Sequence, residues 1–162
     1  MTSKGNSIID LFTQKAIAVT ATVEVMKKEQ LLSVIEAHDF KFFSSEILQK
    51  ADQHYIGKEG VDEALVEVNH AIAETGTVVL ECSNEQVRTA TCVAEHLYVI
   101  VKASTIVECS HDIVDFMTEN TKNQGGYIAF ISGPSRTADI ERVLTVGAHG
   151  PRELTIFIVS DL

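Results

Sequence analysis

Residues 96–102, HLYVIVK, constrain the fold of this chain more than any other segment. They form its most apolar run of β-branched side chains. A strand that is apolar on both faces must be covered on both sides, as central strands of parallel sheets are. The segment therefore predicts a buried central strand in a sheet that other elements enclose.

Segments with helical spacing alternate with strand-like segments along the rest of the chain. The polar segment 46–65 fits two short helical turns, with loops at Gly57 and Gly60. Further expected elements are helices at 7–18, 27–39, 86–94 and 110–126, strands at 19–26, 40–45, 66–68, 77–81, 127–132 and 153–161, and a tight turn at 71–74. This alternation indicates an α/β fold with a largely parallel sheet.

The length of 162 residues fits one domain spanning 1–162. No apolar run approaches the roughly 20 residues that cross a bilayer, and segment 1–12 lacks the apolar core of a signal peptide. We therefore expect a cytoplasmic protein without a membrane span.

In open parallel sheets, ligands bind at the edge where the carboxyl ends of the strands lead into loops.

Charge and cysteine usage limit the partners of the chain. A formal net charge of -10 opposes binding to a phosphate backbone, so we expect no nucleic-acid partner. The three cysteines and six histidines form no CxxC, HxH or HExxH arrangement, so we expect no metal and no iron-sulfur cluster in this chain. The cysteines fit buried thiols.

Both prolines and three of the four arginines lie in residues 131–154, ISGPSRTADIERVLTVGAHGPREL. In SGPSRT, Gly133 permits close backbone approach, while Ser135, Arg136 and Thr137 offer hydroxyl and guanidinium donors. This composition predicts a site for a small anion such as phosphate or carboxylate. The alternative is that Ser135 or Thr137 caps a helix over 138–144.

A second candidate motif is AETGT, residues 73–77. Glu74 is a candidate general base, Gly76 permits a left-handed backbone, and Thr75 and Thr77 complete an anion-binding loop. The alternative is an ordinary turn with a solvated Glu74.

His149, between Gly147 and Gly150, is a candidate for proton transfer beside the SGPSRT loop. A structural histidine in a tight turn is the alternative.

Three segments, NHAIAETGTVVL (69–80), EHLYVIVKASTIV (95–107) and residues 131–154, resemble the lactate-utilisation (LUD) domain family, especially its C-subunit type. The resemblance covers roughly residues 8–160. It implies a Rossmann-like, mostly parallel sheet with flanking helices, similar to the superfamily of glucosamine-phosphate deaminase, ribose-phosphate isomerase and CoA transferase. The chain departs from the family pattern at Val68-Asn69 and at Val93-Ala94-Glu95.

The same resemblance implies a role in oxidising lactate to pyruvate, with iron-sulfur clusters carried only by partner subunits. The anion bound at the ETGT and SGPSRT loops would then be lactate, pyruvate or a phosphate-like group. Two alternatives stay open: a stand-alone enzyme acting on a sugar phosphate, CoA ester or folate, and a non-catalytic binding module.

Overall fold

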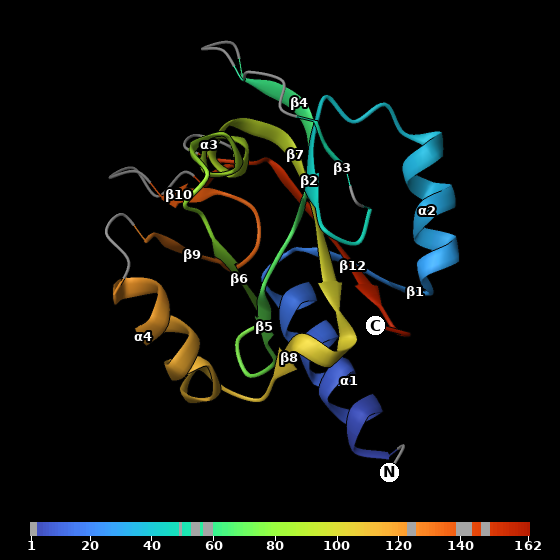
Figure 1. Ribbon diagram of the computed structural model, residues 1–162, viewed down its shortest axis with the longest axis vertical. Helices are drawn as coiled ribbons and strands as arrows, with labels where there is room; N and C mark the ends of the chain where they lie inside the picture. The colour runs from blue at the N-terminus through green and yellow to red at the C-terminus, as the bar shows by residue number, and fades with distance from the viewer. Residues whose placement is uncertain are drawn as a thin grey trace.

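The computed structural model describes most of the chain, and its outline is shown in Figure 1. The described residues are 3–48, 50–52, 56, 60–122, 126–138, 144–146 and 150–162. Their helices and strands alternate around a central sheet, so the predicted α/β fold is confirmed.

A six-stranded sheet forms the centre, with strand order β1-β12-β7-β4-β2-β3. All neighbours in it run parallel except β2 and β3, which pair antiparallel. The predicted central strand is β7, which lies between β12 and β4, and Leu97, Val99 and Val101 are fully buried. The strands are β1 (Thr22–Met26), β2 (Phe42–Ser45), β3 (Lys50–Asp52), β4 (Val61–Glu67), β7 (Ala94–Lys102) and β12 (Glu153–Val159).

A smaller four-stranded sheet, with order β8-β5-β6-β9, packs against one face of the central sheet. Its strands are β5 (His70–Ile72), β6 (Thr77–Glu81), β8 (Ile106–Val107) and β9 (Ile128–Ile131). Alternation along β6 divides its side chains between two cores. Val78 and Leu80 face the large sheet, whereas Val79 packs with Ile113 on the opposite face.

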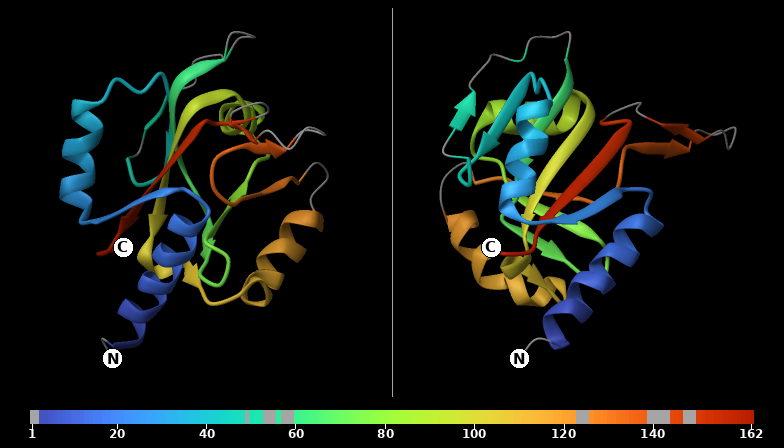
Figure 2. Two further views of the ribbon diagram at one scale, coloured as in Figure 1. Left: turned by 180° about the vertical axis from the view of Figure 1, so that it is seen from behind. Right: turned by 90° about the vertical axis from the view of Figure 1, so that its right-hand side faces the viewer.

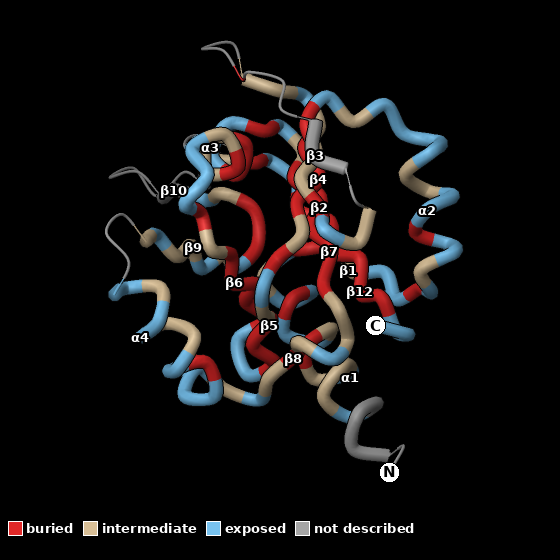
Figure 3. Tube along the Cα trace, viewed as in Figure 1, coloured by how far each residue is buried: buried red, intermediate tan, exposed pale blue. Residues whose placement is uncertain are grey.

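The helices cover both sheets, as the views in Figure 2 show. Helices α1 (Ser3–Ala18) and α3 (Glu85–Val93) join the small sheet on one face of the central sheet, and α2 (Lys28–Ala37) covers the other face. The short 3-10 helix η2 (Ser110–Ile113) and α4 (Val114–Lys122) pack on the outer face of the small sheet. The buried strands lie at the centre of this arrangement (Figure 3).

Three local expectations were wrong. Segment 46–65 contains β3 and most of β4 where helical turns were expected. The turn expected at 71–74 begins two residues later, at 73, because residues 71 and 72 belong to β5. The predicted helix over 138–144 is also wrong at both described ends. A hairpin of β10 (Arg136–Ala138) and β11 (Leu144–Val146) lies there instead. In these segments, hydrogen bonding to a partner strand, often the next one along the chain, overrides the local sequence signals.

None of the described helices combines the length and apolar character that a bilayer crossing requires.

Candidate functional site

The structure brings the ETGT and SGPSRT motifs together. Strands β6 and β9 pair antiparallel, with Val78 opposite Ile131, so the start of β6 lies beside the end of β9. The hydroxyl of Thr77 lies 2.7 Å from that of Thr75 and 2.7 Å from that of Ser132. Thr77 is buried, while Thr75 and Ser132 are exposed. We call this chain of three hydroxyls the motif junction.

Both motif glycines pack against the carboxyl-terminal end of α1. Gly76 has a φ of 66° and Gly133 a φ of 76°, so the left-handed backbone expected at Gly76 is confirmed. A Cβ on Gly76 would lie 2.3 Å from the backbone nitrogen of Ala16, and one on Gly133 would lie 2.1 Å from the carbonyl oxygen of Val19. The close approach that these glycines permit is therefore to the backbone of α1 at Gly76 and to Val19, the residue after α1, at Gly133.

Glu74 lies in the turn between β5 and β6 and is exposed. One of its carboxylate oxygens accepts a hydrogen bond from the Ser110 N–H at 3.3 Å. Its own N–H donates to the carbonyl oxygen of Glu108 at 3.1 Å. These hydrogen bonds connect the ETGT turn to the start of η2. The role of Glu74 as a general base stays a prediction.

The second half of the proline-rich stretch folds back onto the first half. The Ser135 N–H donates to the Pro151 carbonyl oxygen at 2.8 Å, and a Cβ on Gly150 would lie 3.1 Å from the Ser135 Cβ. His149 lies outside the described residues, as does the side chain of Thr137. Gly150 and Pro151 thus lie beside Ser135, and the predicted place of His149 beside the SGPSRT loop stays a prediction.

The two described arginines of this stretch differ in their partners. Arg152 pairs with Glu95 at 3.3 Å, with both side chains largely exposed. Arg136 is exposed and begins β10, opposite Val146. It remains the guanidinium that directly follows the motif junction along the chain.

A cavity of about 320 Å³ lies where the parallel strands β2, β4 and β7 end. Glu67 ends β4, and its side chain is only 10% exposed. It accepts hydrogen bonds from the Ser45 hydroxyl at 2.8 Å, from the Ile47 N–H at 2.9 Å and from the Lys102 ammonium at 2.7 Å. Burial opposes ionisation of Glu67, but these three donors outweigh it and hold its pKa below the ordinary value.

The remaining polar walls of the cavity come from loops and from α3. The N–H of Glu81 donates to Oδ1 of Asn69 at 2.7 Å, and Asn84 Oδ1 accepts from the Gln86 N–H at 2.9 Å as the N-cap of α3. Glu46 and Glu81 also line the cavity. We call this the carboxyl-edge cavity.

Sequence reasoning missed the carboxyl-edge cavity, although signals for it were present. Lys102 ends the most apolar strand of the chain, and Glu67 ends another strand three positions after buried Ala64. Charged residues at the carboxyl ends of parallel strands mark the usual ligand edge of such sheets. Asn69, where the chain departs from the family pattern, is also part of this wall.

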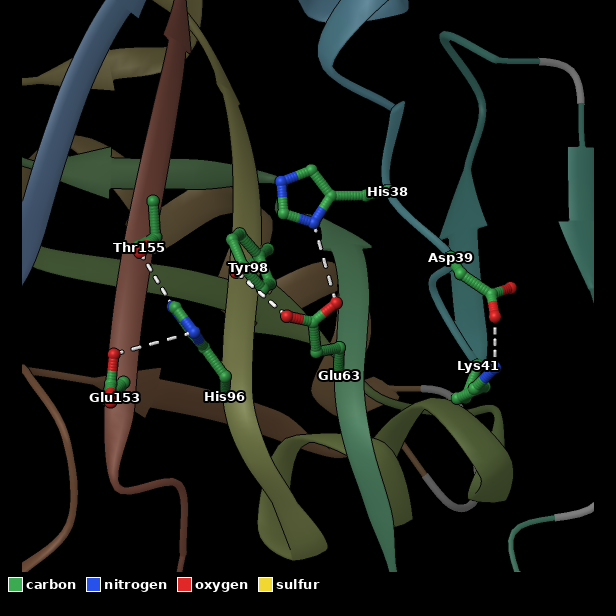
Figure 4. Close-up of polar contacts among 8 residues, drawn as sticks. All are labelled: His38, Asp39, Lys41, Glu63, His96, Tyr98, Glu153 and Thr155. Atoms are coloured by element: carbon green, nitrogen blue, oxygen red, sulfur yellow. Dashed lines mark hydrogen bonds and ion pairs between the residues drawn. The ribbon is translucent and has the colours of Figure 1, made fainter. Parts of the chain in front are cut away.

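A polar row crosses the α2 face of the central sheet near the amino ends of its strands (Figure 4). Glu153, His96 and Glu63 are in register on β12, β7 and β4. His96 Nε2 lies 2.8 Å from the Thr155 hydroxyl, and its ring stacks on Tyr98 with centroids 3.9 Å apart. Burial lowers the pKa of His96, although the carboxylates beside it favour the charged ring.

Glu63 connects this row to the end of α2. The Tyr98 hydroxyl donates to Glu63 at 3.2 Å, and His38 Nδ1 lies 3.6 Å from the other oxygen of the same carboxylate. Burial, together with the negative charge of Glu63, raises the pKa of Tyr98 to about 12. Tyr98 therefore stays a neutral donor at physiological pH.

Within the described ranges, no three histidine, cysteine, aspartate or glutamate side chains are grouped as a metal ion would require. The three cysteines lie on different elements: Cys82 follows β6, Cys92 lies on α3 and Cys109 precedes η2. The expectation of buried thiols is confirmed for Cys82 and is wrong for Cys92, which is exposed, while Cys109 is partly buried. Burial raises the pKa of the Cys82 thiol to about 11, which disfavours the thiolate that metals bind.

Comparison with known proteins identifies the family. A family model of the LUD domain matches residues 41–159. The chain belongs to the LUD domain family. The family resemblance seen in the sequence is thereby confirmed, and the matched region of this LUD domain contains both motifs and the carboxyl-edge cavity.

Several relatives of this LUD domain carry the name lactate utilization protein C, and two of them illustrate the likeness. The protein of Geobacillus kaustophilus is 34% identical over 115 residues, which are 65% of this chain and 48% of the relative. The protein of Anoxybacillus flavithermus is 29% identical over 182 residues, which are 96% of this chain and 82% of the relative. The chain thus spans about half the length of the first of these proteins.

The fold of this LUD domain is shared with a crystal structure of a DUF162 family protein from Deinococcus radiodurans. The TM-score is 0.72, with 96% of this chain and 98% of that chain covered. Sequence identity is 16%, so this likeness establishes the fold alone.

Proposed function

We propose that this LUD domain is a component of a lactate-utilisation system. The proposal is supported by relatives named lactate utilization protein C, one of which aligns over 96% of this chain. Its role would be in the oxidation of lactate to pyruvate, in which lactate loses two electrons and two protons. Partner subunits with iron-sulfur clusters would accept the electrons.

We assign the iron-sulfur clusters to partner subunits because of where the cysteines of this chain lie. A cluster needs several thiolates that converge on one point. The cysteines of this chain occupy separate elements, and the raised pKa of Cys82 disfavours its thiolate. This distribution fits a subunit that binds a ligand or a partner and that does not carry the electrons itself.

The ligand we propose is a small carboxylate, lactate or pyruvate, or a phosphate-like anion bound beside the motif junction. The observation that carries this proposal is the chain of hydroxyls Thr75, Thr77 and Ser132, which joins the two motifs at 2.7 Å contacts. Two of the three O–H protons are used in the two internal hydrogen bonds, so one exposed end of the chain, Thr75 or Ser132, can donate to a carboxylate oxygen. Arg136 follows Ser132 by four residues as the charged donor.

Calorimetric titration of the purified protein with L-lactate, pyruvate and phosphate tests the site. Arg136→Ala should weaken binding by about tenfold to a hundredfold, the loss expected for a charge-assisted hydrogen bond. Arg152→Ala is the matched control, because Arg152 pairs with Glu95, and it should leave the affinity unchanged. Equal affinities in the wild type and in Arg136→Ala, or no binding of any of the three anions, would contradict the site.

The system-level role has a separate test in cells that grow on lactate. Deletion of the gene should stop lactate oxidation, and affinity purification of the tagged protein should recover iron-sulfur proteins. Normal growth of the deletion strain on lactate, with no iron-sulfur protein recovered, would refute the role even if the isolated chain binds an anion.

A further inference from the structure

The carboxyl-edge cavity offers a defined set of hydrogen-bonding groups. Asn69 and Asn84 each commit Oδ1 to a backbone N–H, at 2.7 Å and 2.9 Å. Asn84 Oδ1 also accepts from the Val87 N–H at 3.4 Å, so both of its lone pairs are used, whereas Asn69 Oδ1 keeps one. The donors that the two amides can offer to the cavity are their Nδ2 groups. Both asparagines line the cavity, so two of its walls provide neutral donors.

Lys102 adds a charged donor whose position is fixed. Its ammonium contacts Glu67 at 2.7 Å, and Glu67 is held in turn by the Ser45 hydroxyl and the Ile47 N–H. Because an ammonium has three N–H groups, the bond to Glu67 uses one of them. The side chain of Lys102 is 31% exposed, so the others remain accessible from the cavity.

Acceptors come from the carboxylates of Glu46 and Glu81, which line the same cavity. With Glu67 they place three carboxylates against one ammonium, that of Lys102. The local charge is therefore negative, as is that of the whole chain at -10. A phosphate or carboxylate ligand is opposed by this field, which separates the cavity from the anion site proposed above.

We propose that the carboxyl-edge cavity binds a neutral, polyhydroxylated ligand of about the size of a monosaccharide. Each hydroxyl of such a ligand both accepts, from Asn69, Asn84 or Lys102, and donates, to Glu46 or Glu81, so it uses both kinds of wall. A volume of about 320 Å³ is sufficient for a small ligand, and its place at the ends of parallel strands is where open sheets bind their ligands. This site is independent of the lactate role.

Protein-observed NMR titration tests the proposal with named probes. The neutral probes are D-glucose, D-ribose, myo-inositol and glycerol, and the charged probes are D-glucose 6-phosphate, L-lactate and ethanolamine. At least one neutral polyol should cause saturable shifts of the Ser45, Glu67 and Asn69 signals at millimolar concentration. D-glucose 6-phosphate should bind at least about tenfold more weakly than D-glucose, because of its charge.

Two substitutions at one position test the hydrogen-bonding argument. Asn69→Asp keeps the acceptor for the Glu81 N–H but removes the amide donors, and Asn69→Ala removes both. Each should weaken binding of the neutral polyol by about tenfold, as loss of one hydrogen bond predicts. Asn120→Asp, on α4 and outside the cavity lining, makes the same chemical change and should have no effect.

Three outcomes overturn the proposal: none of the neutral polyols shifts the cavity signals, a charged probe binds there more tightly than all of them, or Asn69→Asp binds as the wild type does. If lactate binds at the motif junction and no neutral polyol binds in the carboxyl-edge cavity, the polyol proposal fails and the proposed lactate role stands.

Discussion

The two faces of the central sheet differ in composition although the same strands build them. On one face, Leu97, Val99, Leu154, Ile156 and Ile158 are buried against α1, α3 and the small sheet. The side chains that alternate with these along each strand point to the α2 face, which carries polar groups near both ends of the strands. The Glu153-His96-Glu63 row lies at the amino ends of the strands, and the Glu67-Lys102 pair lies at their carboxyl ends.

The difference shows on which face of the sheet polar and charged side chains can be placed without a loss of stability. Two helices and the small sheet cover the first face, so a polar group there would lose its hydration without gaining hydrogen-bond partners. On the described part of the opposite face, the helix that packs on the middle of the strands is α2, through Leu31. The strand ends remain partly exposed, and charged side chains are tolerated there because they pair with each other.

The largest effect is expected on the fully covered face. Ile156→Ala removes a side chain with no exposed area from the centre of β12 and should lower the free energy of unfolding by about 3 kcal/mol. Val25→Ala is the control, because Val25 is 52% exposed on β1, and it should cost less than about 0.5 kcal/mol. Urea denaturation measures both, and equal midpoints would contradict the assignment of the apolar face.

An intermediate effect is expected at the ion pair of the opposite face. Lys102→Met leaves the buried carboxylate of Glu67 without its charged partner and should cost about 2 kcal/mol, less than a fully buried pair because Lys102 is 31% exposed. The double variant Lys102→Met with Glu67→Gln should recover part of this loss. Additive losses in the double-mutant cycle would show that the two groups do not interact.

The smallest effect is a pH dependence at the polar row. Burial lowers the pKa of His96 below its unfolded value, so the unfolded chain binds a proton more readily. Stability is therefore complete above the unfolded value of about 6.5 and is lost as the pH falls through the interval down to the folded pKa. The carboxylates of Glu153 and Glu63 oppose this shift, and His38 adds to it.

His96→Gln should reduce the drop in melting temperature between about pH 7.5 and pH 5.5. His111→Gln, at an exposed position in η2, is the control and should keep the wild-type drop. A drop in His96→Gln as large as that of the wild type would show that His96 is not the group responsible.

Much of the fold could be predicted because its signals are local. The helices at 7–18, 27–39 and 86–94 correspond to α1, α2 and α3, and the run 96–102 lies within β7. Strands β3, β5, β10 and β11 were missed because they are three residues long and are defined by their partners. No periodicity of their own distinguishes them from turns.

The candidate sites divide in the same way. The ETGT and SGPSRT motifs were visible because glycine, proline and arginine cluster in the sequence. The carboxyl-edge cavity was not, since Glu67, Asn69 and Lys102 come from different segments and look like ordinary polar residues. Only strand order shows that β4 and β7 are neighbours and that Glu67 and Lys102 meet.

The sequence by itself determined the α/β class, the central buried strand and the motifs that carry the family, because side-chain periodicity and turn residues act over a few neighbouring positions. Only the tertiary structure decided that Gly76 and Gly133 pack at the end of α1 and that the hydroxyls of the ETGT and SGPSRT motifs meet. It also decided that the Glu67-Lys102 pair lines a cavity at the edge of the sheet. Such contacts depend on which strands pair, and pairing is chosen by the burial of the whole core.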